Sequence, residues 1–150
     1  MLSNADIVII GGGLAGLTAG IHLAQHNLRV ILFEKLAYPH HKVCGEYVSN
    51  EVLPYLHQLG ISVDELNPAR IGHFSISTVS GNTIESALPL GGFSVSRYAL
   101  DNHLAQNAVQ SGVTIIQDEV KRISFQETTN VFTIETASGT NFHAKIAIGA

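Results

Sequence analysis

The stretch HHKVCGE gathers side chains that could bind a metal ion or act as a nucleophile. His40 and His41 precede Cys44, the only cysteine of the chain, and Gly45 and Glu46 follow it directly. A zinc site would need a further ligand, and no second cluster of cysteines and histidines appears, so we expect no metal. A nucleophilic thiol would need a base and an activating charge, and the only cation nearby is a lysine. An ordinary loop cysteine, packed as a small hydrophobe, is the remaining alternative.

A second chemical pattern is formed by glycines near the N-terminus. Gly11, Gly13 and Gly16 fit G-x-G-x-x-G, which binds the pyrophosphate of a dinucleotide where it joins a strand to a helix. The first glycine permits a tight turn, the second lets the backbone approach the pyrophosphate, and the third lets helix and strand pack closely. Free amides and the positive dipole end of the helix would supply the anion site. The alternative is a glycine turn without a ligand.

An acidic residue completes this dinucleotide pattern. Glu34 ends the second apolar run, eighteen residues after Gly16, where a carboxylate can accept hydrogen bonds from the ribose hydroxyls of an adenosine. The alternative is a strand-end glutamate that faces solvent. NAD and FAD use the same pyrophosphate chemistry, so these residues alone do not choose between the two cofactors.

The elements that must position these groups can be read from the hydrophobic pattern. Residues 7–10 form a β-branched run typical of a strand buried on both faces, and residues 29–34 form a second strand. Between them, apolar residues recur at helical spacing, with an inward stripe of Leu14, Leu17, Ile21, Ala24 and Leu28. These segments predict a β-α-β unit, whose ligand lies beyond the carboxyl ends of the strands.

The rest of the chain differs from a simple strand and helix alternation. We expect a long loop through Cys44, a helix over 50–59, and a hairpin of strands 71–79 and 83–87. Ser96 should cap a helix that runs to about Ser111 and points inward Leu100, Leu104, Ala105 and Ala108. A strand at 113–117 would rejoin the first sheet, and an antiparallel meander follows at 120–127, 131–136 and 141–149.

Composition excludes several classes of protein. The 150 residues are 45% hydrophobic and 13% charged, which is typical of one globular domain. A net charge of −4 without a basic cluster argues against nucleic acid and anionic lipid headgroups as partners. The apolar stretch at residues 7–19 is shorter than the roughly 20 residues of a membrane span. With one cysteine and no signal-peptide pattern, we expect a cytoplasmic protein.

Taken together, the motifs resemble those of a known group of flavoproteins. The segments IVIIGGGLAGLTAGIHLA with VILFEK, KVCGEYVS, SVSRYALDNHLAQNA and AKIAIGA carry the likeness. The chain resembles the N-terminal part of FAD-dependent oxidoreductases with the fold of glutathione reductase and para-hydroxybenzoate hydroxylase, most of all the geranylgeranyl reductase family. The expected fold class is therefore α/β: a Rossmann-like FAD/NAD(P)-binding domain over residues 1–150, with a parallel sheet, an inserted antiparallel β-meander and, at 71–90, the start of a substrate-domain sheet.

The resemblance also implies residues at the cofactor. Arg97 matches an arginine that reaches the FAD phosphates, and its place at the positive end of a helix independently calls for an anion. The alternative for this residue is an exposed salt bridge to Asp101. The loop of Cys44 and Gly45 would lie by the flavin where the substrate docks. The expected cofactor-binding set is completed by Leu14, Ala15, Lys35, Val120 and Gly149.

The resemblance implies an enzyme that delivers hydride from reduced FAD to a carbon-carbon double bond of an apolar isoprenoid or polyene substrate. NAD(P)H or reduced ferredoxin would be the electron donor, and a lipid substrate would bring peripheral membrane contact. A flavin monooxygenase or halogenase, and a noncatalytic nucleotide-binding or redox-sensing module, remain alternatives. Since AKIAIGA ends at Gly149-Ala150, inside the returning strand, we expect a truncated domain that by itself binds FAD weakly or not at all, shows no turnover, and associates or aggregates through its open hairpin sheet.

Overall fold

The computed structural model describes residues 3–150, and the chain forms two compact units. The first unit combines the residues up to His40 with Asp101–Ala150, and the second is His41–Leu100. The first unit contains the glycine turn, so the fold of this unit decides how a dinucleotide could be held.

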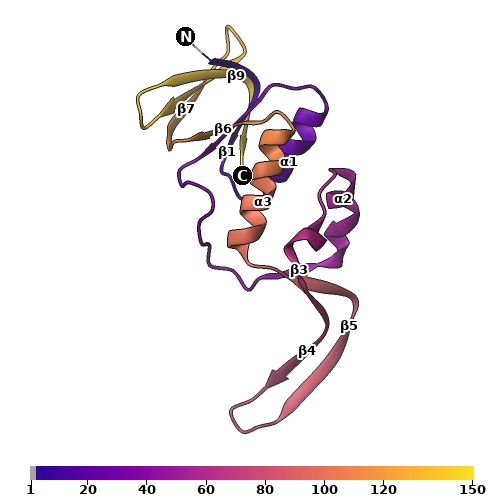
Figure 1. The fold of residues 1–150 in the computed structure, drawn as a ribbon. Coiled ribbons are helices and arrows are strands. Elements are labelled where there is room, and N and C mark those ends of the chain that lie inside the picture. Colours follow the sequence, from indigo (N-terminus) through magenta and orange to yellow (C-terminus); the bar gives the residue numbers. More distant parts are fainter. Residues whose placement is uncertain (1–2) are drawn as a thin grey trace. The chain divides into compact units, whose positions relative to one another are not determined.

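The sheet of the first unit has six strands in the order β6-β2-β1-β9-β8-β7. Strands β6, β2, β1 and β9 are parallel, whereas β7, β8 and β9 pair antiparallel as a meander (Figure 1). The predicted α/β fold class is confirmed, and the meander proves to be continuous with the parallel sheet. The strand bounds are Ser3–Ile10 (β1), Val30–Glu34 (β2), Thr114–Gln117 (β6), Val120–Gln126 (β7), Val131–Thr136 (β8) and Asn141–Gly149 (β9).

The first helix, α1, runs over Leu14–Gln25 and is shorter than the apolar stripe predicted. Its buried residues include Leu17 and Ile21, as expected, together with glycines that let the helix approach the sheet closely. Leu28 is 37% exposed, so its assignment to the inward face was wrong. The helix ends earlier because Asn27 adopts a left-handed φ of 62°, which turns the chain toward β2.

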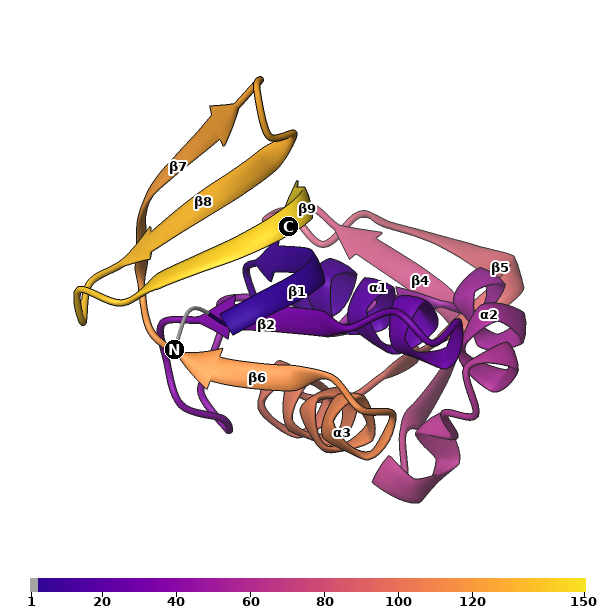
Figure 2. The same ribbon diagram turned by 90° about the horizontal axis from the view of Figure 1, so that it is seen from above.

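Figure 2 shows the meander strands β8 and β7 continuing the sheet beyond β9, and residues of β8 and β9 share one buried cluster with residues of β1 and β2. Phe33 of β2 and Phe142 of β9 meet edge to face, with ring centroids 5.0 Å apart. The other face of β1 packs on α1, where Ile9 lies against Gly20. The buried cluster consists of Ala5, Val8, Ile31, Phe33, Ile134, Phe142 and Ala144.

Helix α3 runs over Arg97–Gln110, and the boundary between the units falls within it. The backbone N–H of Ala99 donates to the Ser96 hydroxyl at 3.2 Å, so the predicted N-cap is confirmed. All four side chains predicted to point inward are buried: Leu100, Leu104, Ala105 and Ala108.

The second unit contains a three-stranded sheet in the order β3-β5-β4. The predicted hairpin exists, but its strands are Ala69–Ser77 (β4) and Thr83–Ser94 (β5), so the return strand was predicted too short. It continues because its second half pairs with β3, Tyr47–Ser49, which was not predicted. The helical segments of this unit are Asn50–Val52 (η1), Leu53–Gln58 (α2) and Val63–Leu66 (η2).

The hairpin carries apolar side chains that its own unit does not cover. Figure 1 shows β4 and β5 as a long ribbon, and its exposed hydrophobic residues include Phe74, Ile76, Ile84 and Leu90. This agrees with the expected exposure of apolar side chains on the hairpin. Within residues 3–150, none of the helices has the length and apolar character needed to cross a membrane.

Candidate functional site

The turn between β1 and α1 has the geometry that the glycine pattern predicts. Gly11 has a φ of 110°, and a Cβ there would collide with the carbonyl group of Ala150. A Cβ on Gly16 would collide with the Gly11 carbonyl, so the helix packs directly on the turn. Around Gly13, by contrast, no other atom lies within 4 Å of the position of a Cβ. The turn is therefore tight on its inner side and open where a ligand would approach.

Glu34, at the end of β2, reaches back to this turn. One carboxylate oxygen, Oε2, accepts from the Gly12 amide at 3.0 Å, and Oε1 accepts from the Leu36 amide at 3.1 Å. The residue is only 8% exposed, so the alternative of a glutamate that faces solvent is wrong. The carboxylate is thus held in place by backbone donors beside the glycine turn.

A tyrosine that the sequence analysis did not select also contacts the turn. The hydroxyl of Tyr38 donates to the Gly12 carbonyl at 2.6 Å. A Cβ on Gly12 would collide with this hydroxyl and crowd the Glu34 side chain, so the middle glycine is required as well. Burial, and then the nearby carboxylates of Glu34 and Asp101, raise the pKa of Tyr38 further above neutral pH. One feature of the sequence could have indicated this contact, because Gly12 is a glycine at a variable position of the G-x-G-x-x-G motif.

Four of the expected cofactor residues line one small cavity of about 200 Å³. Gly11 belongs to the turn, Glu34 and Lys35 to the end of β2, and Val120 to the start of β7. The structure therefore brings together groups separated by more than a hundred positions in the sequence. Its lining is completed by Ile10, Phe33, Asp118 and Glu119.

The charged groups of this cavity are the carboxylates of Glu34, Asp118 and Glu119 and the ammonium of Lys35. The hydroxyls of Ser138 and Thr136 lower the pKa of Asp118. A hydrogen bond from Lys121 lowers the pKa of Glu119. Both groups are therefore ionised at neutral pH, as hydrogen-bond acceptors.

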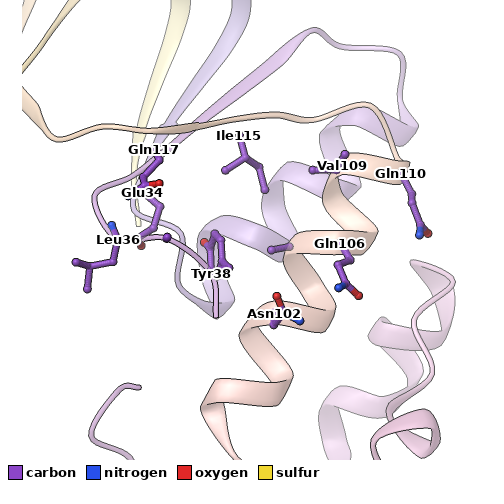
Figure 3. Close-up of a pocket in the computed structure, with 11 residues that line it drawn as sticks. Glu34, Leu36, Tyr38, Asn102, Gln106, Val109, Gln110, Ile115 and Gln117 are labelled. Atoms are coloured by element: carbon purple, nitrogen blue, oxygen red, sulfur yellow. The ribbon is translucent and has the colours of Figure 1, made fainter. Parts of the chain in front are cut away.

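A larger cavity of about 520 Å³ lies between α3, β6 and the loop after β2 (Figure 3). It shares Glu34 with the smaller cavity, and Tyr38 contributes to its wall. Its polar lining is dominated by neutral carboxamides, and it contains no lysine or arginine. The carboxamide residues are Asn102, Gln106, Gln110 and Gln117.

The remaining expected residues of the first unit lie at the edge of the turn. Leu14 and Ala15 are the first residues of α1, where the amides of a helix have no intrahelical acceptor. Gly149 pairs with Ile10 in the parallel register of β9 and β1, and the next amide, that of Ala150, donates to the Ile10 carbonyl at 2.9 Å. All three are thus next to the glycine turn, and their contact with a cofactor stays a prediction.

Cys44, Gly45 and Arg97 belong to the second unit, and their roles at a cofactor stay predictions as well. Cys44 is exposed in its loop, so it is not packed as a small hydrophobe, and the alternative of an ordinary loop cysteine stays open. Asp101 is fully buried, so it is not the exposed partner that the alternative of a surface salt bridge assumed. In the part of the chain that the structure describes, no three His, Cys, Asp or Glu side chains gather as a metal site.

The mixed sheet, the glycine turn and the acid at the end of β2 define a dinucleotide-binding domain of the Rossmann type. Comparison with known proteins specifies it further, since residues 6–42 match the family model described as an FAD binding domain. The chain is similar to FAD-dependent oxidoreductases over nearly its whole length, and its cofactor is FAD.

Two curated relatives show how the sequence is related to characterised enzymes. Digeranylgeranylglycerophospholipid reductase 1 of Methanosphaera stadtmanae is 34% identical, over 98% of this chain and 38% of its own length. The 1H-pyrrole-2-carbonyl-[peptidyl-carrier protein] brominase of Pseudoalteromonas luteoviolacea is 30% identical, over 79% of this chain and 30% of its own length. The resemblance to the geranylgeranyl reductase family is confirmed, and the chain spans well under half the length of either relative.

Solved structures share the fold at low sequence identity. The flavin-dependent brominase Bmp2 superposes with a TM-score of 0.82 at 21% identity, covering 99% of this chain and 38% of that one. The p-nitrophenol 4-monooxygenase PnpA of Pseudomonas putida has a TM-score of 0.84 at 16% identity, covering 100% of this chain and 41% of that one. These likenesses show that the chain shares their fold.

Proposed function

We propose that this chain is the FAD-binding part of an enzyme that reduces carbon-carbon double bonds in an apolar isoprenoid or polyene substrate. The observation that carries the proposal is the 34% identity to a digeranylgeranylglycerophospholipid reductase over 98% of the chain. The relative's name gives a lipid with isoprenoid chains as its substrate. The same chemistry on a similar apolar substrate is the simplest function for this chain.

The first unit supplies the groups that would hold the ADP half of FAD. The open space at Gly13 and the first amides of α1 suit the pyrophosphate, and the carboxylate of Glu34 suits the ribose hydroxyls. The same cavity is bordered by the carboxylates of Asp118 and Glu119 and by the ammonium of Lys35. These groups could accept hydrogen bonds from the ribose hydroxyls of FAD or donate to them.

The second unit would serve the flavin and the substrate. Arg97 would reach the FAD phosphates, and the loop of Cys44 and Gly45 would lie along the flavin. The exposed apolar side chains of the β4–β5 hairpin would begin the substrate-domain sheet. Reduced FAD would supply the hydride, while the chain binds and orients the cofactor and excludes water.

The partners and location follow from the same proposal. NAD(P)H or reduced ferredoxin would deliver the electrons, and the enzyme would work in the cytoplasm. A lipid substrate would bring it into peripheral contact with a membrane.

The proposal is tested first by its cofactor and then by its product. The protein should release FAD on acid denaturation, identified by chromatography against FMN and NAD standards. The anaerobically reduced holoprotein should be reoxidised by a polyprenyl lipid, whose mass should rise by one hydrogen molecule per double bond reduced. A saturated lipid of equal length is the matched control. Flavin that is reoxidised by neither lipid would contradict the proposed reduction.

A flavin monooxygenase or halogenase is the second candidate function, favoured by the 30% identity to a brominase. It predicts that reduction of the flavin is followed by oxygen consumption that depends on an aromatic substrate and, for a halogenase, on bromide or chloride. Substrate-dependent oxygen uptake without a reduced lipid product would favour this candidate over the first.

The role of the cysteine loop has its own test. Cys44→Ser should leave FAD bound and metal content at zero, while changing activity or substrate choice in the active enzyme. Stoichiometric zinc that disappears in Cys44→Ser would overturn the assignment of this loop to the flavin.

A further inference from the structure

We propose that Tyr38 is a positioning residue for the pyrophosphate of FAD. Its hydroxyl and the carboxylate of Glu34 together orient two consecutive peptide groups of the glycine turn. The inference rests on the proposed placement of the pyrophosphate at Gly13 and the start of α1.

The first peptide group joins Gly11 to Gly12. Glu34 accepts a hydrogen bond from the N–H of this group at 3.0 Å. Because a trans peptide is planar, with its N–H and C=O on opposite sides, this bond also sets the direction of the Gly11 carbonyl. That carbonyl lies where a Cβ on Gly16 would be, so the helix can approach only when this peptide keeps its orientation.

The second peptide group joins Gly12 to Gly13, and here Tyr38 acts. Its hydroxyl holds the Gly12 carbonyl at 2.6 Å. The same planarity then directs the Gly13 N–H away from the tyrosine. The space around Gly13 is open, and α1 begins at the next residue. The amide therefore lies in the row of donors that the helix N-terminus offers to an anion.

A run of three glycines needs such external support. Glycine has more backbone freedom than any other residue, so an unsupported turn would lose much of that freedom when FAD binds. Tyr38 and Glu34 restrain both peptide groups before the ligand arrives. The Tyr38 hydroxyl is protonated at neutral pH, as tyrosine hydroxyls ordinarily are, and it donates to the Gly12 carbonyl. The turn is thereby preorganised for the pyrophosphate.

The test compares two tyrosines that make the same kind of hydrogen bond. Tyr38→Phe should weaken FAD and ADP binding about three- to ten-fold, the effect of one lost hydrogen bond, and leave adenosine binding unchanged. Tyr47 donates to the Gly91 carbonyl at 3.2 Å within the second unit, so Tyr47→Phe is the matched control and should leave the affinities of ADP and adenosine unchanged. Affinities of FAD, ADP and adenosine are measured by calorimetry or by competition with FAD.

Comparison of FAD, ADP and adenosine separates a loss of pyrophosphate positioning from a general loss of structure. If Tyr38→Phe weakens adenosine as much as ADP, or leaves FAD and ADP unchanged, the inference is wrong. Gly13→Val tests the underlying placement, since its φ of −80° and ψ of −172° suit any residue and the valine would fill the open space. If Gly13→Val leaves FAD binding intact, the placement of the pyrophosphate fails. If it abolishes FAD binding while Tyr38→Phe has no effect, only the role of Tyr38 fails.

Discussion

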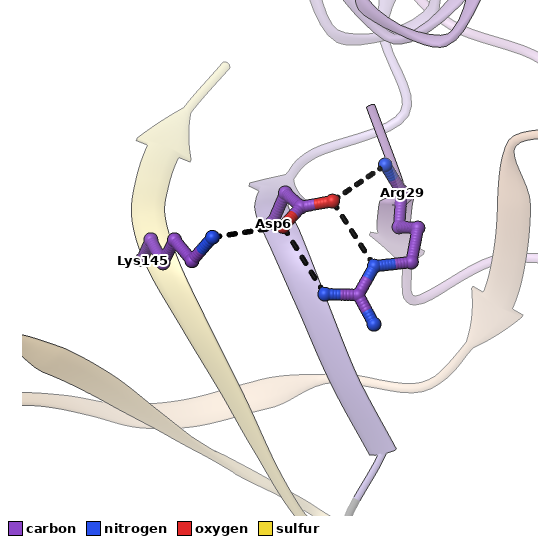
Figure 4. Close-up of polar contacts among 3 residues, drawn as sticks. All are labelled: Asp6, Arg29 and Lys145. Carbon is purple, nitrogen blue, oxygen red and sulfur yellow. Dashed lines mark hydrogen bonds and ion pairs between the residues drawn. The ribbon is translucent and has the colours of Figure 1, made fainter. Parts of the chain in front are cut away.

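The two ends of the parallel sheet each carry a carboxylate that accepts a backbone hydrogen bond from a neighbouring segment, but the surroundings differ. Asp6 of β1 accepts from the Arg29 amide and guanidinium at 3.0–3.1 Å and from the Lys145 ammonium at 3.3 Å (Figure 4). The hydrogen bonds of Arg29 hold the pKa of Asp6 well below its usual range. Glu34 accepts instead from two backbone amides and borders two cavities.

The difference separates a structural carboxylate from one suited to a ligand. Asp6 is surrounded by cations from β9 and from the residue before β2, so its charge is already balanced and its bonds connect three segments of the sheet. Glu34 is oriented by peptide groups beside a space of ligand size. Two carboxylates on adjacent strands thus have separate tasks because of their partners, not their chemistry.

The largest expected effect comes from Glu34. Glu34→Ala removes the acceptor of the Gly12 amide and the proposed ribose contact, so FAD affinity should fall about ten- to hundred-fold, as for lost hydrogen bonds to a charged group. Calorimetric titration with FAD measures the change. The exposed Glu127 serves as the control, because Glu127→Ala should bind FAD as the wild type does. Unchanged affinity in Glu34→Ala would remove this residue from the site.

Asp6→Asn should affect stability rather than FAD affinity. It should lower the melting temperature by a few degrees, because two cations lose their partner, and leave FAD affinity unchanged. Thermal unfolding followed by circular dichroism, beside the same FAD titration, checks both parts. A loss of FAD affinity comparable to that of Glu34→Ala would show that the two ends of the sheet are not independent.

The pH dependence of stability should show whether the ionised carboxylate of Asp6 is the source of its structural role. The pKa of Asp6 is lowered in the folded state, so its contribution is fully present above the unfolded pKa of about 3.9 and is lost as the pH falls toward the folded pKa. The difference in melting temperature between wild type and Asp6→Asn should therefore be constant near neutral pH and shrink below about pH 4. A difference that persists unchanged into acid would show that the ionised carboxylate is not its source.

The smallest effect is expected from Lys145. Its side chain is 73% exposed, so Lys145→Met should lower the melting temperature less than Asp6→Asn does, and added salt should reduce the difference further. Melting curves at low and high ionic strength provide the measurement. An effect as large as that of Asp6→Asn would mean that the ammonium, and not Arg29, dominates this cluster.

Most of the fold could be predicted from the sequence because its signals are local. The β-branched run at 7–10, the glycine turn and the apolar stripe around Leu17 and Ile21 each specify their own element. The end of α1 was missed because a left-handed Asn27 overrides the apolar spacing that continues to Leu28. The length of β5 was missed because it depends on pairing with β3, a contact between distant segments.

The candidate site was predictable only where a motif describes it. The roles of Gly11 and Gly16 in the turn follow from their spacing, and the structure agrees. Tyr38 belongs to no motif, and its contact with Gly12 depends on how the loop after β2 folds back. The buried state of Asp101 was missed for a similar reason, since a charged residue on a helix is usually exposed.

The pairing of β1 with β9 has a consequence for how the molecule folds. Residues 3–10 lie beside residues 142–149, so the centre of the sheet closes between segments 139 positions apart in the sequence. Such non-local pairing slows folding, because the intervening chain must be ordered before the contact is gained. During synthesis, one edge of the apolar β1 strand therefore stays unpaired until β9 has left the ribosome. This interval is when the protein should be most exposed to aggregation and most dependent on chaperones.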